Sequence, residues 1–362
     1  MNNRYSLLIL LIPGLLAGCA APEADIFTGP PAPVLPADPP VLNQVDMVLA
    51  GVLGGLIPPW EEWPPREEVS PAPPGSVIVT RSLPLSSLAY FSRLRPRLHA
   101  SLEEAGISRF EISRYPSPGG EGWEVSVAVD GQVMYRVELV QKIAARVAVI
   151  IDDCGNSLKN RDLLFTLDYP LTVAILPGLA HSAAVDRLAA EHGFEVMLHC
   201  PLEAIDPDIP LGPGSIDGGM APDEMSRVFE EDIRSVPHAV GMNNHMGSAF
   251  TADTEAMRLL MDEVRKKGLF FVDSLTVRDT VTRETAEAAG VRHAFRDIFL
   301  DHEMNDEFII RQFGVLKRKA LHRGCAIAIG HDRQLTLEIV SREIPSLADD
   351  NIQLVPVSDL IE

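Results

Sequence analysis

Two adjacent carboxylates and three histidines are the residues whose types and positions point to chemistry. Asp152 and Asp153 come directly after the apolar run RVAVII, and His199, His245 and His331 follow three later apolar runs. Two neighbouring carboxylates ordinarily raise the pKa of one of them, whereas a divalent cation would neutralise one and leave the other as a base. Imidazole is a good ligand for zinc. The five residues therefore predict a catalytic metal site, most simply a zinc site, that activates water and polarises a carbonyl.

Each of these motifs also has a purely structural explanation when it is taken alone. An Asp-Asp pair can form a turn with two solvated carboxylates, and a single histidine at a strand end is often a core histidine with its hydrogen bonds satisfied. Three histidines at strand ends make coincidence a weaker explanation, so the pattern favours metal binding.

Four further polar residues are additional candidates for the same site. Glu203 lies four residues after His199, although Pro201 disfavours a regular helix between them. Asn244 directly precedes His245, and Asp273 and Asp301 each follow an apolar run. The structural alternative for the acidic residues is a helix cap or a partner that orients a histidine.

Short apolar runs must position these side chains. The runs cover residues 146–151, 171–176, 195–198, 240–242, 269–272, 299–300, 326–329 and 352–355. Entirely apolar strands are buried on both faces, and helical segments such as 182–192 and 253–267 separate them, which is typical of a parallel sheet covered by helices. We predict a distorted (β/α) barrel of about seven strands over residues 142–362, whose strand ends would carry the site. An open doubly wound sheet is the alternative, although its G-x-G-x-x-G fingerprint is absent.

The N-terminal part of the chain predicts export and anchoring. Residues 1–18 have a basic start, an apolar run and a small-residue end, which indicates a secretory signal. Cys19 follows Leu-Ala-Gly, as in the lipoprotein box of bacteria, which predicts a lipidated protein of the periplasm, held at the outer membrane because Ala20 and not Asp comes next. Ordinary signal cleavage is the alternative. Residues 19–75 contain 14 of the 29 prolines, so we expect a tether there.

A small α+β module is expected over residues 76–141. The periodicity of 85–105 predicts a helix, and 109–115, 123–129 and 132–140 read as strands, the last two joined by an Asp-Gly hairpin. The module carries no chemical motif, so contact with an envelope protein partner or with the cell wall is its expected role.

Composition excludes several classes of function. The net charge is −20 and aromatic residues make up 6%, which argues against a nucleic-acid partner. Contact with the membrane is expected through the lipid alone, because no other stretch is long and apolar enough to span a bilayer. The apolar run 45–57 is too short and is broken by glycine, so it predicts a short packed helix instead. No G-x-S-x-G elbow supports a serine hydrolase. With Cys19 lipidated, Cys154, Cys200 and Cys325 allow one internal disulfide at most.

Several blocks in a fixed order resemble the divergent polysaccharide deacetylase family. They are AVIIDDCGNS (148–157), LTVAILPGLAHS (171–182), EVMLHCPLEA (195–204), GMNNHMGSAFTAD (241–253), LFFVDS (269–274), RDIFLDHE (296–303) and AIAIGH (326–331). The resemblance covers nearly all of residues 146–360. It implies a distorted (β/α) barrel of the NodB-like kind that removes N- or O-acetyl groups from a polysaccharide with the help of zinc or a similar metal.

The resemblance also implies roles for single residues. Asp152 matches the general base, Asp153 and His199 match metal ligands, and His331 matches the general acid for the leaving amine or alcohol. The family's usual second histidine is replaced by Glu203, so His245 is the expected substitute ligand. Because this metal motif is incomplete, two functions are expected: a metal-dependent deacetylase of an envelope or extracellular polysaccharide, or a non-catalytic envelope protein that binds a glycan or a protein in the barrel cleft.

Overall fold

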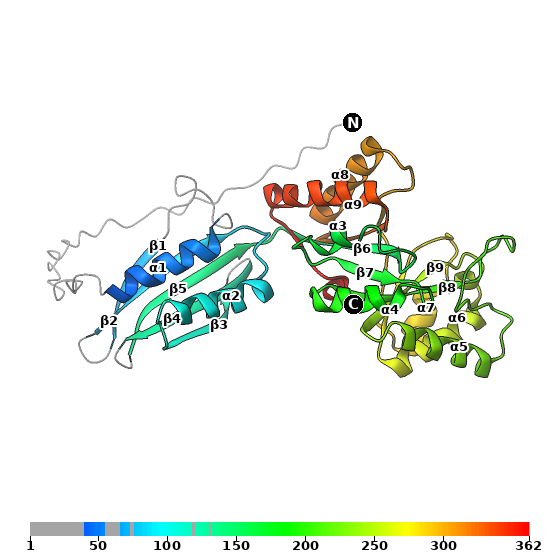
Figure 1. Cartoon of the computed structure of the whole chain (residues 1–362), viewed down its shortest axis with the longest axis horizontal. Coiled ribbons are helices and arrows are strands. Elements are labelled where there is room, and N and C mark those ends of the chain that lie inside the picture. The colour runs from blue at the N-terminus through cyan, green and yellow to red at the C-terminus, as the bar shows by residue number, and fades with distance from the viewer. Residues whose placement is uncertain (1–39, 55–65, 73–75, 118–119, 130–131, 362) are drawn as a thin grey trace, which may run out of the picture. The chain divides into compact units, whose positions relative to one another are not determined.

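The computed structural model describes residues 40–54, 66–72, 76–117, 120–129 and 132–361 (Figure 1). The signal sequence, Cys19 and the first part of the expected tether lie outside the described residues. The described residues form a smaller mixed sheet followed by a larger parallel sheet. No described helix combines the length and the apolar character that crossing a bilayer requires.

The smaller sheet has five strands. They are β1 (Arg66–Ala72), β2 (Ser76–Leu85), β3 (Phe110–Ser117), β4 (Gly120–Val129) and β5 (Gln132–Lys142), in the order β1-β2-β5-β4-β3. β2 and β5 are parallel, whereas the other neighbours are antiparallel. β4 and β5 pair up to Val129 and Gln132, as the Asp-Gly signal predicts, although Asp130 and Gly131 themselves lie outside the described residues. α1 (Pro40–Leu53) and α2 (Phe91–Glu104) share one apolar core with this sheet.

Part of the segment expected to be a tether is instead regular structure. α1 and β1 both lie within residues 19–75, so the module includes residues well before 76. No proline lies between residues 41 and 57, and Val45, Leu49 and Val52 recur at helical spacing and are buried in the core of the module. β1 tolerates Pro71 because it is an edge strand. Proline density over the whole segment therefore concealed β1, whereas the apolar run 45–57 already indicated a short packed helix, which α1 confirms.

The larger sheet is entirely parallel and is surrounded by helices. Its strands are β6 (Ala145–Cys154), β7 (Thr172–Ile175), β8 (Glu195–Leu202), β9 (Ala239–Met246), β10 (Phe270–Asp273), β11 (His293–Phe295), β12 (Ile298–Phe299), β13 (Cys325–His331) and β14 (Ile352–Leu354). The helices are α3 (Arg161–Phe165), α4 (Ser182–Glu191), α5 (Pro222–Ser235), α6 (Thr254–Lys267), α7 (Thr282–Ala289), α8 (Asp306–Arg323) and α9 (Gln334–Glu343), with 3-10 turns η1 (Phe250–Ala252), η2 (Ile344–Asp350) and η3 (Val357–Leu360).

The order of these strands distinguishes the barrel from a doubly wound sheet. The order is β11-β10-β9-β8-β7-β6-β13-β12, and β14 pairs with the first residues of β6. Read as a ring, this order follows the sequence from β6 to β13, with the opening between β11 and β12. A doubly wound sheet would instead reverse its order at a switch point. The fold is thus a curled (β/α) half-barrel of eight strands, in agreement with the predicted barrel of about seven, with β14 added beside β6.

Burial on both faces explains the apolar strands. On β6, Val147, Val149 and Ile151 pack in the core under the helices, whereas Ala148 and Ile150 pack inside the curl of the sheet. Residues alternate between the two faces of a strand, so both sets must be apolar. Because the strands are parallel, their carboxyl ends lie along the same edge of the sheet, and polar side chains at those ends are brought together.

Candidate functional site

The carboxyl ends of β6, β8, β9 and β13 bring the predicted residues together. In the sheet register, Asp152 on β6 lies opposite His331 on β13, and His199 on β8 lies opposite Asn243 on β9. His245 follows two residues after Asn243 and therefore points to the same face of β9.

A local break in β6 lets both adjacent carboxylates reach this group. The pairing of β6 with β7 shifts between Ile151 and Cys154, and Asp153 has a φ of 60°, in the left-handed region. Such a conformation is uncommon for a residue other than glycine and is typical of functional sites. The nearest carboxylate oxygens of Asp152 and Asp153 lie 3.7 and 3.2 Å from Nε2 of His199. The usual alternation would have turned one of the two side chains away.

Three side chains form a triangle of ligand atoms. Oδ1 of Asp153 lies 3.2 Å from Nε2 of His199 and 3.1 Å from Nδ1 of His245, and these two nitrogens lie 3.2 Å apart. In a tetrahedral zinc site with bonds of about 2.0–2.1 Å, ligand atoms are about 3.3–3.4 Å apart. Oδ1 of Asp153 is buried and has no hydrogen-bond partner among the described residues. The spacing, the donor types and this unsatisfied oxygen all fit a divalent cation.

Asn243 determines which nitrogen of His199 faces the triangle. Nδ2 of Asn243 donates a hydrogen bond to Oδ1 of Asp152 at 2.8 Å, because a carboxylate oxygen accepts. Oδ1 of Asn243 therefore accepts the hydrogen bond from Nδ1 of His199, at 2.9 Å. Neutral His199 then carries its lone pair on Nε2, which is the atom in the triangle. Such partners orient metal-binding histidines in many proteins.

Asp301 orients His331 in a similar way. Nδ1 of His331 donates to Oδ1 of Asp301 at 2.8 Å, so Nε2 faces the triangle, 3.9 Å from Oδ2 of Asp153. The other Asp301 oxygen accepts from the backbone N–H of His331 at 3.0 Å and from Thr336 at 2.7 Å. Burial lowers the pKa of His331, but the Asp301 carboxylate, helped by Asp153 and Asp152, outweighs it and raises that pKa above its ordinary value. His331 is thus suited to donate a proton.

The adjacent carboxylates have opposite pKa shifts. Burial raises the pKa of Asp152, and His199 and His331 offset it only in part. Burial also opposes ionisation of Asp153, but contacts with His199 and His245 outweigh it and hold the Asp153 pKa well below its usual range. For His199, burial lowers the pKa, but the two carboxylates raise it to about 8. Carboxyl groups whose pKa values are driven apart commonly divide the roles of acid, base and ligand.

The other candidate residues lie around the triangle rather than in it. Glu203 accepts from the backbone N–H of Gly218 at 2.9 Å and so holds a loop. Oδ1 of Asn244 accepts from the backbone N–H of Ser274 at 2.8 Å, which links β9 to the end of β10. Asp273 accepts from the backbone N–H of Leu275 and from two threonine hydroxyls, Thr280 and Thr282. Asp273 thus holds the loop after β10, and it neither caps a helix nor contacts a histidine among the described residues.

Asn243 is the site residue for which the sequence analysis assigned no role. Alternation along β9 would have indicated it, because residues 243 and 245 share a face whereas Asn244 points to the other. The structure bears this out, since Asn243 contacts both Asp152 and His199.

A cavity lies beside the triangle of ligand atoms. Its volume is about 190 Å³, and it is lined by Asp153, His245 and the loop 210–213.

Cys154 and Cys200 are buried and form no disulfide within the described part of the chain. Burial raises the pKa of both thiols, which disfavours the thiolate that a metal ligand requires.

A family of known proteins matches the part of the chain that carries this site. The family described as divergent polysaccharide deacetylase matches residues 149–361. The uncharacterized protein YibQ of Escherichia coli K12 is 32% identical over 219 residues, which are 60% of this chain and 68% of YibQ. An uncharacterized protein of Haemophilus influenzae is 34% identical over 216 residues, 60% of this chain and 76% of that protein. The crystal structure of the uncharacterized protein ATU2773 of Agrobacterium tumefaciens shares the fold, with a TM-score of 0.55 at 24% identity over 60% of this chain and 89% of that one.

Proposed function

Because this chain belongs to the divergent polysaccharide deacetylase family, we propose that its barrel is a metal-dependent hydrolase that removes acetyl groups from an envelope or extracellular polysaccharide. The observation that carries the proposal is the triangle of Asp153, His199 and His245, with Asp152 and His331 beside it. A binding cleft without catalysis would not require a buried carboxylate of raised pKa on one side of a cation site and a histidine held by Asp301 on the other.

Asp153, His199 and His245 would hold the cation, and zinc is the metal we propose. Two imidazole nitrogens and one carboxylate oxygen are a common ligand set of catalytic zinc, which keeps a further position open. When bound, such a cation lowers the pKa of water and polarises a carbonyl oxygen.

The residues around the triangle would handle the protons. Asp152 is almost fully buried, and its Oδ1 is held by Asn243, so its carboxylate is placed to accept a proton from the attacking water. Its raised pKa strengthens it as a base. His331, held at Nδ1 by Asp301, would deliver a proton from Nε2 to the leaving amine or alcohol. The hydrolysis then yields acetate and the deacetylated sugar.

The test is acetate release by the full chain after reconstitution with zinc. Chitin oligomers, peptidoglycan and acetylated xylan are suitable acetylated probes. We expect Asp152→Asn to lower kcat/KM by about 10²–10⁴-fold, because general base catalysis contributes about that much. Asparagine still accepts the hydrogen bond from Asn243, so the variant should bind zinc as the wild type does. Asp262→Asn on the exposed face of α6 is the matched control and should keep full activity.

Two outcomes would contradict the proposal. Failure of the reconstituted wild type to bind any of zinc, nickel, cobalt or manganese would exclude the metal-dependent reaction. Binding of metal with no acetate release from any probe, or equal release by Asp152→Asn, would favour the alternative function, in which the barrel binds a glycan or a protein without catalysis.

We further propose that Cys19 is lipidated and holds the protein in the periplasm, at the outer membrane. The support is the signal-like segment before it and the Leu-Ala-Gly-Cys sequence. We expect cells to incorporate labelled palmitate into the wild type and into Cys325→Ser, but not into Cys19→Ser. One lipidated cysteine carries the anchor, so Cys19→Ser should leave the membrane fraction. Equal labelling of Cys19→Ser would refute the anchor.

A further inference from the structure

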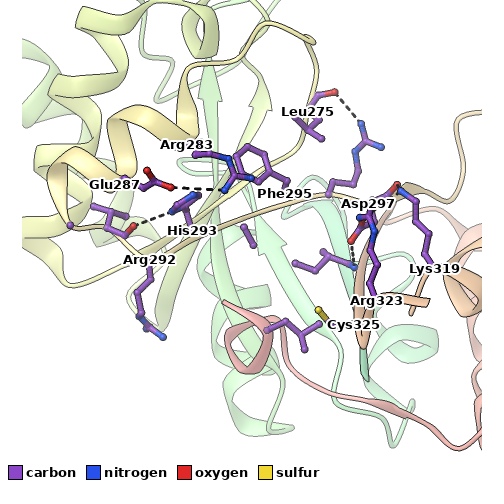
Figure 2. A pocket seen from close by; sticks show the side chains of 16 residues that line it. Leu275, Arg283, Glu287, Arg292, His293, Phe295, Asp297, Lys319, Arg323 and Cys325 are labelled. Carbon is purple, nitrogen blue, oxygen red and sulfur yellow. Dashed lines mark hydrogen bonds and ion pairs between the residues drawn. The ribbon is translucent and has the colours of Figure 1, made fainter. Parts of the chain in front are cut away.

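A second, larger cavity lies where the barrel is open. Its volume is about 900 Å³, and α7, α8, β11, the start of β13 and η3 contribute its lining (Figure 2). None of its lining residues lines the cavity beside Asp153. β11 and β12 are not hydrogen-bonded to each other, so the parallel sheet parts here.

The lining has a strong excess of positive charge in an acidic protein. Five lining side chains are cationic, namely Arg283, Arg292, Arg296, Lys319 and Arg323, and two are anionic, namely Glu287 and Asp297. The cavity therefore carries three more positive than negative charges, whereas the whole chain has a net charge of −20. This local reversal of sign is the first indication of an anionic ligand.

The two carboxylates are already engaged by part of this charge. Asp297 accepts from Arg323 at 2.8 Å and lies 3.4 Å from Nζ of Lys319, while its other oxygen accepts from the backbone N–H of Ile327 at 3.0 Å. Glu287 lies 4.0 Å from Arg283 across one turn of α7. Figure 2 shows Arg283 and Glu287 on one side of the cavity and Asp297, Lys319 and Arg323 on the other.

Arg296 is a cation held by neutral groups. Its Nε and one terminal nitrogen donate to the backbone carbonyls of Ser274 and Leu275 at 2.7 and 3.0 Å, and its guanidinium lies 5.0 Å from the centre of the Phe299 ring. The described residues place no carboxylate within ion-pair distance of it. Burial lowers the pKa of Arg296, because neighbouring carboxylates offset the loss of water around the cation only in part.

The remaining lining residues could contact a ligand larger than a single ion. Phe295 lies beneath the guanidinium of Arg283, with 4.9 Å between that group and the ring centre, and Leu360 of η3 lines another wall. Arg292 is exposed at the rim. Binding sites for small molecules typically measure about 300–1,000 Å³ and combine apolar walls with a few polar groups. This cavity has that size, and its lining combines the apolar side chains of Phe295 and Leu360 with an unusually large share of charged groups.

We propose that this cavity binds the phosphate group of a phosphorylated ligand about the size of a sugar. A phosphate monoester carries about −1.5 to −2 charges at neutral pH, which suits an excess of three positive charges better than a single carboxylate does. The planar guanidinium groups of four arginines favour paired hydrogen bonds to its oxygens. Phe295 and Leu360 would contact the remainder of the ligand. The site is separate from the proposed deacetylase site and does not depend on it.

Calorimetric titration of the zinc-reconstituted full chain tests this assignment. The probes are inorganic phosphate, glucose monophosphate, glucuronate and glucose. We expect glucose monophosphate to bind with a Kd of about 1 mM or lower, glucuronate at least about tenfold more weakly, and glucose not at all. Inorganic phosphate should also bind, more weakly than glucose monophosphate.

Paired variants locate the binding. Arg283→Gln/Arg292→Gln removes two exposed charges of the cavity and should weaken binding of glucose monophosphate about tenfold or more. Arg227→Gln/Arg258→Gln removes the same charge from α5 and α6, which contribute no residue to the cavity lining, and should leave the Kd within about twofold. Circular dichroism and a cooperative thermal unfolding transition establish that both proteins are folded, and Arg283→Gln alone replaces the double variant if that protein does not fold.

Three results would overturn the proposal. The first is no binding of either phosphate compound at about 10 mM. The second is a probe that binds as tightly as glucose monophosphate or more tightly. If that probe is glucuronate, the cavity is assigned to carboxylates. If it is inorganic phosphate, the sugar-sized ligand is excluded. The third is binding that survives Arg283→Gln/Arg292→Gln but disappears in Asp153→Asn, which would place the phosphate at the metal triangle.

Discussion

Asp153→Asn is expected to reduce bound zinc from about one equivalent to less than about 0.1 after reconstitution and dialysis, and to abolish acetate release. The substitution removes the anionic ligand whose Oδ1 lies 3.1–3.2 Å from both histidine nitrogens and has no hydrogen bond of its own. An amide oxygen is a weaker ligand and brings no charge. His245→Gln should have the same effect, because it removes another corner of the triangle. Elemental analysis of the purified proteins measures the result.

The controls for this prediction separate metal loss from unfolding. Asp262→Asn changes the net charge equally but lies on α6, outside the triangle, and should keep its zinc. Circular dichroism should show that all three metal-free proteins are folded. If both Asp153→Asn and His245→Gln retained stoichiometric zinc, these residues would not be the ligands.

Acid should release the same metal from the wild type. The carboxylates of Asp152 and Asp153 raise the pKa of His199 to about 8 against the opposite effect of burial. A proton on Nε2 competes with a cation for the same lone pair, so zinc affinity should fall as the pH drops below about 8. A zinc affinity that does not change between neutral and acidic pH would contradict the assignment of His199 as a ligand.

Asp301→Asn is expected to lower kcat/KM by about 10–100-fold and to move the alkaline limb of its pH profile to lower pH. His331 must be protonated to act as an acid, and the Asp301 carboxylate is the main group that raises the His331 pKa. Without that charge the pKa falls, and His331 loses its proton at a lower pH. The profile of acetate release against pH measures the shift.

Zinc content distinguishes this role from metal binding. Asp301 contacts His331 and Thr336 but is not a member of the triangle, so Asp301→Asn should bind zinc as the wild type does. His331→Gln should be less active still and should lack the limb altogether. An Asp301→Asn profile with the wild-type alkaline limb would show that His331 is not the acid.

The apolar strands and their polar ends could be predicted from the sequence because packing in a parallel sheet restricts which residue types a strand can contain. A strand buried on both faces must be apolar throughout, as β6 is, and parallel strands must present their carboxyl ends on one edge. Asp152, Asp153, His199, His245 and His331 were found in this way, and the structure places all five together. Residues that are near in space because of a regular rule can be predicted from that rule.

Irregular backbone and long-range packing could not be predicted in the same way. The positive φ of Asp153 and the register shift beside it are local departures from the strand, and they decide that both carboxylates face one site. The apolar run 45–57 indicated a short packed helix, but only the structure shows that α1 shares its core with the small sheet. Each of these features depends on contacts with elements distant in the chain.

The sequence by itself thus determined the family, the parallel (β/α) barrel and the identity of the chemical groups at its strand ends. Only the tertiary structure decided how those groups are oriented, through Asn243 and Asp301, and that the barrel opens between β11 and β12. It also gathered Arg283 and Arg292 with Arg296, Lys319 and Arg323 at that opening. Periodicity reports which face of an element is buried, whereas the meeting of side chains from α7, α8 and β11 depends on how the sheet curls.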